Sequence, residues 1–204
     1  IFAYVGPKGS GKTHEGTRVA IEQLRLGRYV VAVIPTLDVS RVAEFLQDES
    51  VYERLRVVDY EAVDDPNFFP DEARIKLLRA PDGSMQPGPD FDPTAWRESV
   101  VPTGAVVIID EAWRWLEDQK TIPPKFKKAL HMARHWRGPA DWREADDRKR
   151  FLDESDPWHP GLGGDPAKGG DGTDLVSMNI LLLTQDYSSL NRTLRKQVDQ
   201  ICDI

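Results

Sequence analysis

Eight consecutive residues near the start of the chain have the types and spacing that bind phosphate groups. They are Gly6, Pro7, Lys8, Gly9, Ser10, Gly11, Lys12 and Thr13, which read G-x-x-x-x-G-K-[ST], and the predicted binding set also includes His14. This pattern is the phosphate-binding P-loop. Its glycines permit the tight backbone turns that point N–H groups at phosphate oxygens. Lys12 supplies a positive charge for the β- and γ-phosphates, and the Thr13 hydroxyl is suited to ligate Mg²⁺. The residues predict a site for ATP with Mg²⁺.

A pair of carboxylates forms the second chemical signal. The apolar run 105–109 leads directly into Asp110 and Glu111. The carboxyl end of a buried parallel strand lies at the sheet edge where ligands bind, so Asp110 is predicted to bind Mg²⁺ together with Thr13. Glu111 is predicted to be the general base that orients the attacking water. Two acids after a strand are also typical of an ordinary helix N-terminus. The P-loop upstream favours the interpretation of these two acids as a metal ligand and a general base.

Three further side chains are candidates for contact with the γ-phosphate. A buried strand ends in Thr184 and Gln185, and an amide there is placed to touch the γ-phosphate or to orient the attacking water. Arg134 and Arg137 follow the helix after the acid pair, and a guanidinium from a neighbouring subunit would neutralise charge in the transition state. The alternatives are a strand-end amide that bonds loop backbone and a solvated basic helix end. The predicted catalytic set is Lys12, Glu111, Gln185, Arg134 and Arg137.

Histidines and tryptophans near the same helices are predicted to be structural. His131 and His135 are four residues apart, but no third metal ligand accompanies them. Trp113, Trp115 and Trp136 are predicted to pack in the core or at a subunit interface rather than to stack on bases.

The elements that must position these residues read as alternating strands and helices. Predicted strands cover 1–5, 29–34, 55–59, 105–111, 178–185 and 198–204, and predicted helices cover 13–26, 40–47, 94–100, 112–117, 123–136 and 190–196. Near-continuous aliphatic strands are typical of a parallel sheet buried on both faces. The sequence therefore predicts an α/β fold of the P-loop NTPase type, with a mainly parallel sheet between two helical layers. The order of the strands favours the ATPases that have an added strand and a catalytic Glu over small-molecule kinases.

Composition narrows the class of protein. The 204 residues carry a net charge of −7 and one cysteine, Cys202, which is predicted to be an ordinary strand residue. The negative charge gives no global nucleic-acid signature, so any DNA contact would have to be local. A single cysteine allows no internal disulfide, which is compatible with a reducing compartment. No apolar run reaches the roughly 18 to 20 residues that a membrane span needs.

Residues 1–204 are predicted to form one P-loop NTPase domain with two insertions. The stretches 64–93 and 138–173 are rich in Pro, Gly and Asp and are predicted to be flexible surface insertions, the first with a helical island near 71–78. The chain starts at Ile1 and stops at Ile204 inside apolar runs. We therefore expect it to be part of a longer protein, whose membrane segment would lie outside these residues.

Four motifs together carry a resemblance to a known family. They are the P-loop, Asp110-Glu111, the segment Ala133-Arg134-His135-Trp136-Arg137-Gly138 and the strand end Leu183-Thr184-Gln185. With these motifs the chain resembles the N-terminal cytoplasmic domain of the zonular occludens toxin (Zot) family, which includes the gene I assembly proteins of filamentous phages. The resemblance spans almost the whole chain and is most specific over 105–111, 130–138 and 180–186. In the family the Arg-His helix leads quickly into the Thr-Gln strand, whereas here 138–173 stands between them.

The resemblance implies an inner-membrane ATPase that drives assembly and export of filamentous phage, anchored by one membrane span after the ATPase domain. It also implies a homo-oligomeric ring on the cytoplasmic face of the bacterial inner membrane. Its implied partners are phage assembly or export proteins and phage DNA. Two other functions fit the residues. One is a helicase-type or DNA-translocating ATPase, and the other is a nucleotide-gated membrane adaptor that binds ATP without turnover.

Overall fold

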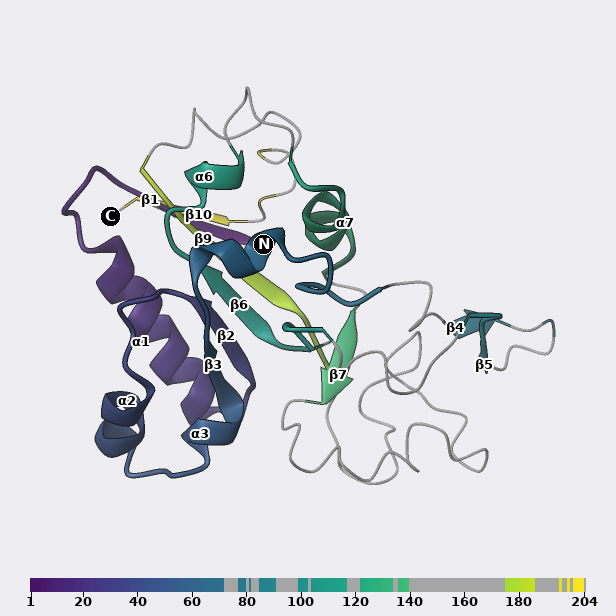
Figure 1. The fold of residues 1–204 in the computed structure, drawn as a ribbon, viewed down its shortest axis with the longest axis horizontal. Helices are drawn as coiled ribbons and strands as arrows, with labels where there is room; N and C mark the ends of the chain where they lie inside the picture. Colours follow the sequence, from purple (N-terminus) through teal and green to yellow (C-terminus); the bar gives the residue numbers. More distant parts are fainter. Residues whose placement is uncertain are drawn as a thin grey trace.

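A six-stranded, wholly parallel sheet forms the centre of the molecule (Figure 1). The computed structural model describes residues 1–71, 77–79, 81, 85–90, 99–102, 104–116, 122–133, 136–139, 175–185, 195, 198 and 200–203. The strands are β1 (Phe2–Val5), β2 (Val30–Val33), β3 (Leu55–Val57), β6 (Val106–Ile109), β9 (Asn179–Thr184) and β10 (Gln200–Asp203). Their order is β10-β1-β9-β6-β2-β3. The strand β9 therefore lies between the P-loop strand β1 and the acid-tipped strand β6, which confirms the predicted added strand.

Helices cover both faces of this sheet. Successive side chains of a strand point to opposite faces, so each strand contributes residues to two separate hydrophobic clusters. On one face, residues of β2, β6 and β9 pack against α1 (Lys12–Arg25) and α2 (Val39–Leu46); this cluster includes Ala20, Leu24, Ala32, Val42, Ile108 and Leu183. On the other face, the alternate residues of the same strands pack against α7 (Pro124–Met132); this cluster includes Val31, Val107, Leu182, Phe126 and Ala129. The predicted three-layer α/β fold of the P-loop NTPase type is confirmed.

Short elements complete the described part of the chain. The helices α3 (Val51–Arg54) and α6 (Trp113–Leu116) and the 3₁₀ helix η1 (Tyr60–Asp64) connect or follow strands of the sheet. Two antiparallel pairs stand apart from it: β4 (Leu77–Arg79) with β5 (Met85–Pro87), and β7 (Arg137–Pro139) with β8 (Leu175–Ser177). Within the described residues, no helix has both the length and the apolar character that crossing a bilayer requires.

The predicted surface excursion over 64–93 is wrong at Phe68 and Phe69. Each of these rings is 1% exposed and belongs to the core. The two rings meet edge to face with centroids 4.8 Å apart, and Phe69 stacks on Phe126 of α7 at 5.5 Å. Burial of two aromatic side chains thus outweighs the turn-forming residues that surround them in sequence.

Three element boundaries also differ from the prediction. Leu77 and Leu78, placed in a helical island near 71–78, lie in strand β4. Gly138 and Pro139, assigned to the second insertion, pair with β8 as part of β7. The helix predicted over 123–136 is already complete at Met132. The predictions for 140–173, and for most of 94–100 and 190–196, lie outside the described residues.

Candidate nucleotide-binding site

The loop between β1 and α1 has the backbone of a phosphate cradle. Gly9 and Gly11 adopt φ values of 84° and 92°, a left-handed region that costs a residue with a Cβ atom. The N–H of Gly6 donates to the Thr184 carbonyl of β9 at 3.2 Å, and the N–H of Ser10 donates to the Pro7 carbonyl at 3.2 Å. The loop is thereby fixed to the sheet at its start and closed by its own turn. It ends at Lys12, where α1 begins and its free N–H groups and positive dipole end are available to an anion.

Lys12 lies across this loop. Its side chain is buried, and Nζ donates to the carbonyls of Gly6 at 2.7 Å and of Pro7 at 2.8 Å. An ammonium group has three N–H donors, and these carbonyls account for two of them. The charge of Lys12 is thus held inside the concave side of the loop, where phosphate oxygens would lie.

Thr13 and Asp110 meet at the carboxyl end of the sheet, as predicted. The Thr13 hydroxyl donates to Asp110 Oδ2 at 2.7 Å, although the two residues are 97 positions apart in the sequence. Asp110 is buried at 5% exposure, and its backbone N–H donates to the Val33 carbonyl of β2 at 3.1 Å. A hydroxyl and a carboxylate are oxygen ligands of the kind that Mg²⁺ binds together with phosphate oxygens and water. Because Thr13 and Asp110 supply two such oxygens beside the phosphate-binding loop, they fit Mg²⁺ as a partner of a bound phosphate. In the described part of the chain there is no group of three or more His, Cys, Asp or Glu that could hold a metal.

Glu111 stands in an unusual backbone conformation directly after Asp110. Its φ is 51°, in the left-handed region that side-chain-bearing residues seldom adopt outside special sites. The N–H of Glu111 donates to Asp110 Oδ1 at 2.9 Å, and the N–H of Ala112 donates to the Leu183 carbonyl at 2.9 Å. The first bond closes the turn, and the second ties it to β9, which ends at Thr184 directly before Gln185.

The Glu111 carboxylate accepts two side-chain hydrogen bonds. The exposed Gln185 amide donates Nε2–H to Glu111 Oε2 at 3.4 Å. The indole Nε1–H of Trp113 donates to the same oxygen. The structure thus brings together Lys12, Thr13, Asp110, Glu111 and Gln185 at the carboxyl ends of β1, β6 and β9.

Other predicted residues lie at the edge of this group or outside the described chain. Pro7, Lys8 and His14 are exposed around the loop and the first turn of α1. The backbone of Arg137 lies in β7, but its side chain and all of Arg134 are outside the described residues. Their catalytic roles stay predictions.

Two buried hydroxyls beside the loop are without a hydrogen-bond partner in the described part of the chain. They are Ser10 Oγ within the loop and Thr184 Oγ1 at the end of β9. Buried polar atoms are usually satisfied, so an unpaired one marks a place where a ligand or water would bind. Thr184 was predicted only as the neighbour of Gln185, and its position on the last residue of β9 is the signal that points to it.

A cavity lies next to Glu111, and the sequence alone does not indicate that the residues lining it belong near the site. It measures about 320 Å³ and is lined by Tyr60, Glu61, Asp64, Trp113, Arg114 and Trp115. Burial raises the pKa of the Tyr60 phenol, and the nearby charges of Asp110 and Glu111 raise it further, while Arg114 lowers it. The Arg114 guanidinium lies 4.2 Å from the centre of the Tyr60 ring. The buried Trp115 and Trp136 confirm the predicted core role of those residues, but Trp113 bonds the site itself.

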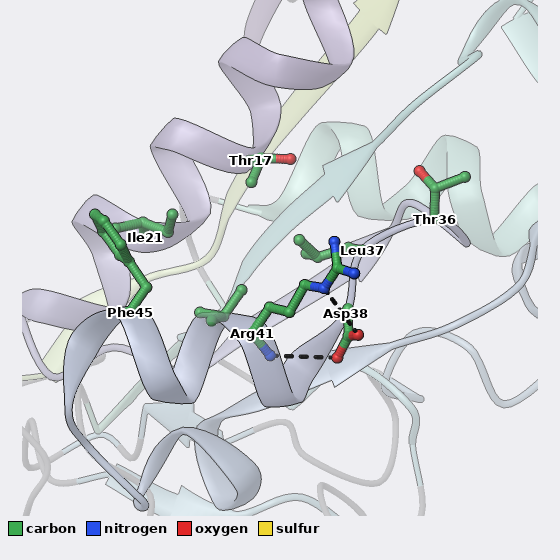
Figure 2. A pocket seen from close by; sticks show the side chains of 8 residues that line it. Thr17, Ile21, Thr36, Leu37, Asp38, Arg41 and Phe45 are labelled. Atoms are coloured by element: carbon green, nitrogen blue, oxygen red, sulfur yellow. Dashed lines mark hydrogen bonds and ion pairs between the residues drawn. The ribbon is translucent and has the colours of Figure 1, made fainter.

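A second cavity lies between α1 and the start of α2 (Figure 2). Its volume is about 310 Å³, and its walls are Thr17, Ile21, Thr36, Leu37, Asp38, Arg41, Val42 and Phe45. Asp38 Oδ1 accepts the N–H groups of Ser40 at 2.9 Å and Arg41 at 3.3 Å, which caps α2. The Arg41 guanidinium turns toward the same carboxylate, so the main polar groups here stabilise a helix start.

Comparisons with known proteins identify the fold. No family model matches the chain, and no curated protein matches it. Among solved structures, the genome packaging NTPase B204 of Sulfolobus turreted icosahedral virus 2 in complex with AMPPCP is similar at 16% identity and a TM-score of 0.50, covering 100% of this chain and 73% of that one. The same protein in complex with AMP is similar at 19% identity and a TM-score of 0.50, covering 100% and 74%. Together with the sheet order and the loop, this likeness establishes that the chain has the α/β fold of P-loop NTPases.

Proposed function

We propose that this chain binds ATP with Mg²⁺ and hydrolyses it to ADP and phosphate. The observation that carries the proposal is the 2.7 Å hydrogen bond from Thr13 Oγ1 to Asp110 Oδ2, which joins the P-loop helix to the acid-tipped strand. A hydroxyl and a carboxylate in contact beside a phosphate cradle are the groups expected around a nucleotide-bound Mg²⁺. The solved structures with this fold include complexes of an NTPase with AMPPCP and AMP, which supports the choice of nucleotide.

Each residue of the site has a role in this reaction. The loop N–H groups and Lys12 would hold the β- and γ-phosphates, and Thr13 and Asp110 would hold Mg²⁺, which neutralises phosphate charge when bound. Glu111 would take the proton of the attacking water as the new bond to the γ-phosphorus forms and the bond to the β,γ-bridging oxygen breaks. Gln185, which donates to Glu111 at 3.4 Å, would orient the same water. Arg134 and Arg137 are proposed to neutralise transition-state charge.

The test is a comparison of the parent with Glu111→Gln. The amide keeps the shape of the side chain but removes the base, so the turnover number should fall by roughly 10² to 10⁴. ATP affinity should stay within about twofold, because Lys12 and Thr13 provide the contacts to phosphate and metal. Asp110→Asn is the informative companion variant, since it weakens the metal site and should raise the Mg²⁺ concentration that half-maximal activity needs. If Glu111→Gln hydrolyses ATP at the rate of the parent, Glu111 is not the general base.

We further propose that the ATPase drives assembly and export of filamentous phage from the cytoplasmic face of the bacterial inner membrane. The support is the resemblance of 105–111, 130–138 and 180–186 to the Zot family. In that role the chain would act as a ring of identical subunits, anchored by a membrane segment outside the residues described here. Loss of phage export, with intact intracellular phage DNA, in a host that carries Lys12→Ala would support this role.

DNA translocation is the second candidate, and the solved structures with this fold favour it. The similar protein is a genome packaging NTPase, and its fold alone is shared here. A DNA-driven motor should hydrolyse ATP faster when single- or double-stranded DNA is added, whereas an export motor without DNA contact should not respond. A protein that binds ATP but shows no turnover in the parent would instead be the nucleotide-gated adaptor.

A further inference from the structure

The Glu111 carboxylate is held from α6 as well as from β9. Trp113, two residues further along, donates its indole Nε1–H to Glu111 Oε2, and Gln185 donates to the same oxygen at 3.4 Å. Counting described residues alone, both side-chain bonds end on Oε2 and none ends on Oε1. One carboxylate oxygen is thus used to fix the group, and the other is left to accept a proton.

The backbone around Glu111 leaves only its side-chain torsions to be fixed. The residue is in the left-handed region at φ 51°, and Ala112 N–H donates to the Leu183 carbonyl at 2.9 Å. These constraints set the start of the side chain. A glutamate side chain still has three rotatable bonds, so the direction of the carboxylate depends on the groups that bond it.

The turn that carries Trp113 is itself anchored. Trp115 is 8% exposed and donates Nε1–H to Asp64 Oδ1 at 3.1 Å. Arg114 lies over the Tyr60 ring at 4.2 Å. The two residues that follow Trp113 therefore attach α6 to η1, and the indole ring of Trp113 extends from a fixed support toward Glu111.

We propose that Trp113 is a positioning residue for the base: its indole N–H fixes Glu111 Oε2 so that the carboxylate faces the attacking water. This inference rests on the proposed function, since it concerns the orientation of the base in that reaction. Displacement of a reacting group by about 1 Å can reduce a rate by roughly 100-fold. Trp113→Phe keeps the ring but removes the donor. Its turnover number should therefore fall by about 10- to 100-fold, while the KM for ATP stays within about twofold.

The matched control is Trp115→Phe. It removes an indole donor from the same turn, but the donor that it removes bonds Asp64 rather than Glu111. Its turnover should stay within about threefold of the parent. Thermal unfolding of both variants checks that neither result comes from loss of the fold.

A double-mutant comparison separates positioning from a structural effect. If Trp113 acts through Glu111, then adding Trp113→Phe to Glu111→Gln should change the residual rate by less than twofold. An equal loss in both backgrounds would show a structural effect and overturn the inference. So would a parent-like rate for Trp113→Phe alone, with the proposed function left standing. A parent without ATP turnover would overturn the proposed function, and this inference with it.

A measurement that needs no turnover checks the hydrogen bond directly. In ¹⁵N-labelled protein, the indole N–H resonance that Trp113→Phe removes should move when Glu111→Gln is introduced. The Trp115 indole resonance should stay in place. An unmoved Trp113 resonance would contradict the contact on which the inference depends.

Discussion

Lys12 combines a structural and a ligand-binding role in one side chain. Its ammonium donates to the Gly6 and Pro7 carbonyls, so it draws the two ends of the loop together before any phosphate is considered. A hydrogen bond to a charged group is typically worth about 1.5–3 kcal/mol. The same charge, offered to a triphosphate, would account for much of the affinity of the site.

The prediction for Lys12→Ala follows from this geometry. ATP should bind roughly 10- to 100-fold more weakly, since about 1.4 kcal/mol corresponds to a factor of ten. Isothermal titration calorimetry with a non-hydrolysable ATP analogue measures the change. Lys127→Ala removes an exposed lysine of α7 and should bind like the parent. Equal affinity for Lys12→Ala and Lys127→Ala would exclude Lys12 from the phosphate site.

At the scale of elements, α1 packs closely against the sheet at Gly16. Gly16 is buried in α1, and a Cβ atom added there would lie 2.6 Å from Leu183 Cδ1 and 3.3 Å from Ile108 Cγ2. Both distances are shorter than ordinary carbon contacts, and these side chains are themselves buried. The absence of a side chain at Gly16 therefore lets α1, the helix that follows the P-loop, lie directly on β6 and β9.

Gly16→Val should accordingly destabilise the fold. Overpacking a close-packed core typically costs about 1–3 kcal/mol, which exceeds the small gain in helix propensity. We expect a loss of about 2 kcal/mol in the free energy of unfolding, measured as a lower urea midpoint with an unchanged m-value. Glu22→Val introduces the same side chain on the exposed face of α1 and should cost less than about 1 kcal/mol. A smaller loss for Gly16→Val than for Glu22→Val would contradict the close contact.

Arg54 fixes the far end of the same helix. Its guanidinium is buried and donates to the Leu24 carbonyl at 2.6 Å, to Asp48 Oδ2 at 2.6 Å and to Ser50 Oγ at 2.8 Å. The Leu24 carbonyl belongs to the last turn of α1, where carbonyls have no partner within the helix, and it also accepts the N–H of Gly27 at 3.0 Å. One side chain from α3 thus closes the end of α1 and orders the loop that follows α2.

Replacing this guanidinium by an apolar side chain of similar length should be costly. Arg54→Met removes the buried hydrogen bonds to the Leu24 carbonyl, Asp48 and Ser50 together, so we expect a loss of about 2 kcal/mol in stability, measured by chemical denaturation. Arg41→Met removes an arginine whose side chain is 85% exposed and whose ion pair with Asp38 spans 3.6 Å. Such exposed pairs contribute little, so this control should lie within about 0.5 kcal/mol of the parent. If Arg54→Met and Arg41→Met lose similar amounts of stability, the buried bonds of Arg54 contribute no more to folding than an exposed ion pair.

At the scale of the whole molecule, the sequence predicts those parts that depend on local patterns. The P-loop and the strand ends at Asp110 and Gln185 are predictable, because one motif and two aliphatic runs specify them and parallel strands bring their carboxyl ends to one edge. The burial of Phe69 depends on its stacking with Phe126, far along the chain, and no local sequence pattern predicts it. The bond from Trp113 to Glu111 depends on the left-handed backbone conformation of Glu111, which hydrophobic periodicity does not reveal.

The position of β1 in the sheet has a consequence for synthesis on the ribosome. β1 holds the P-loop and begins at Phe2, yet its neighbours in the sheet are β9 and β10, near the other end of the described chain. The strand β2 pairs with both β3 and β6, and these three strands emerge much earlier than β9. At about 5–20 residues per second, the interval between Val5 and Asn179 lasts roughly 9 to 35 seconds. Throughout that time the nascent chain has the P-loop residues but no strand beside them. Cellular ATP would therefore meet a competent site only when translation of this region is almost complete.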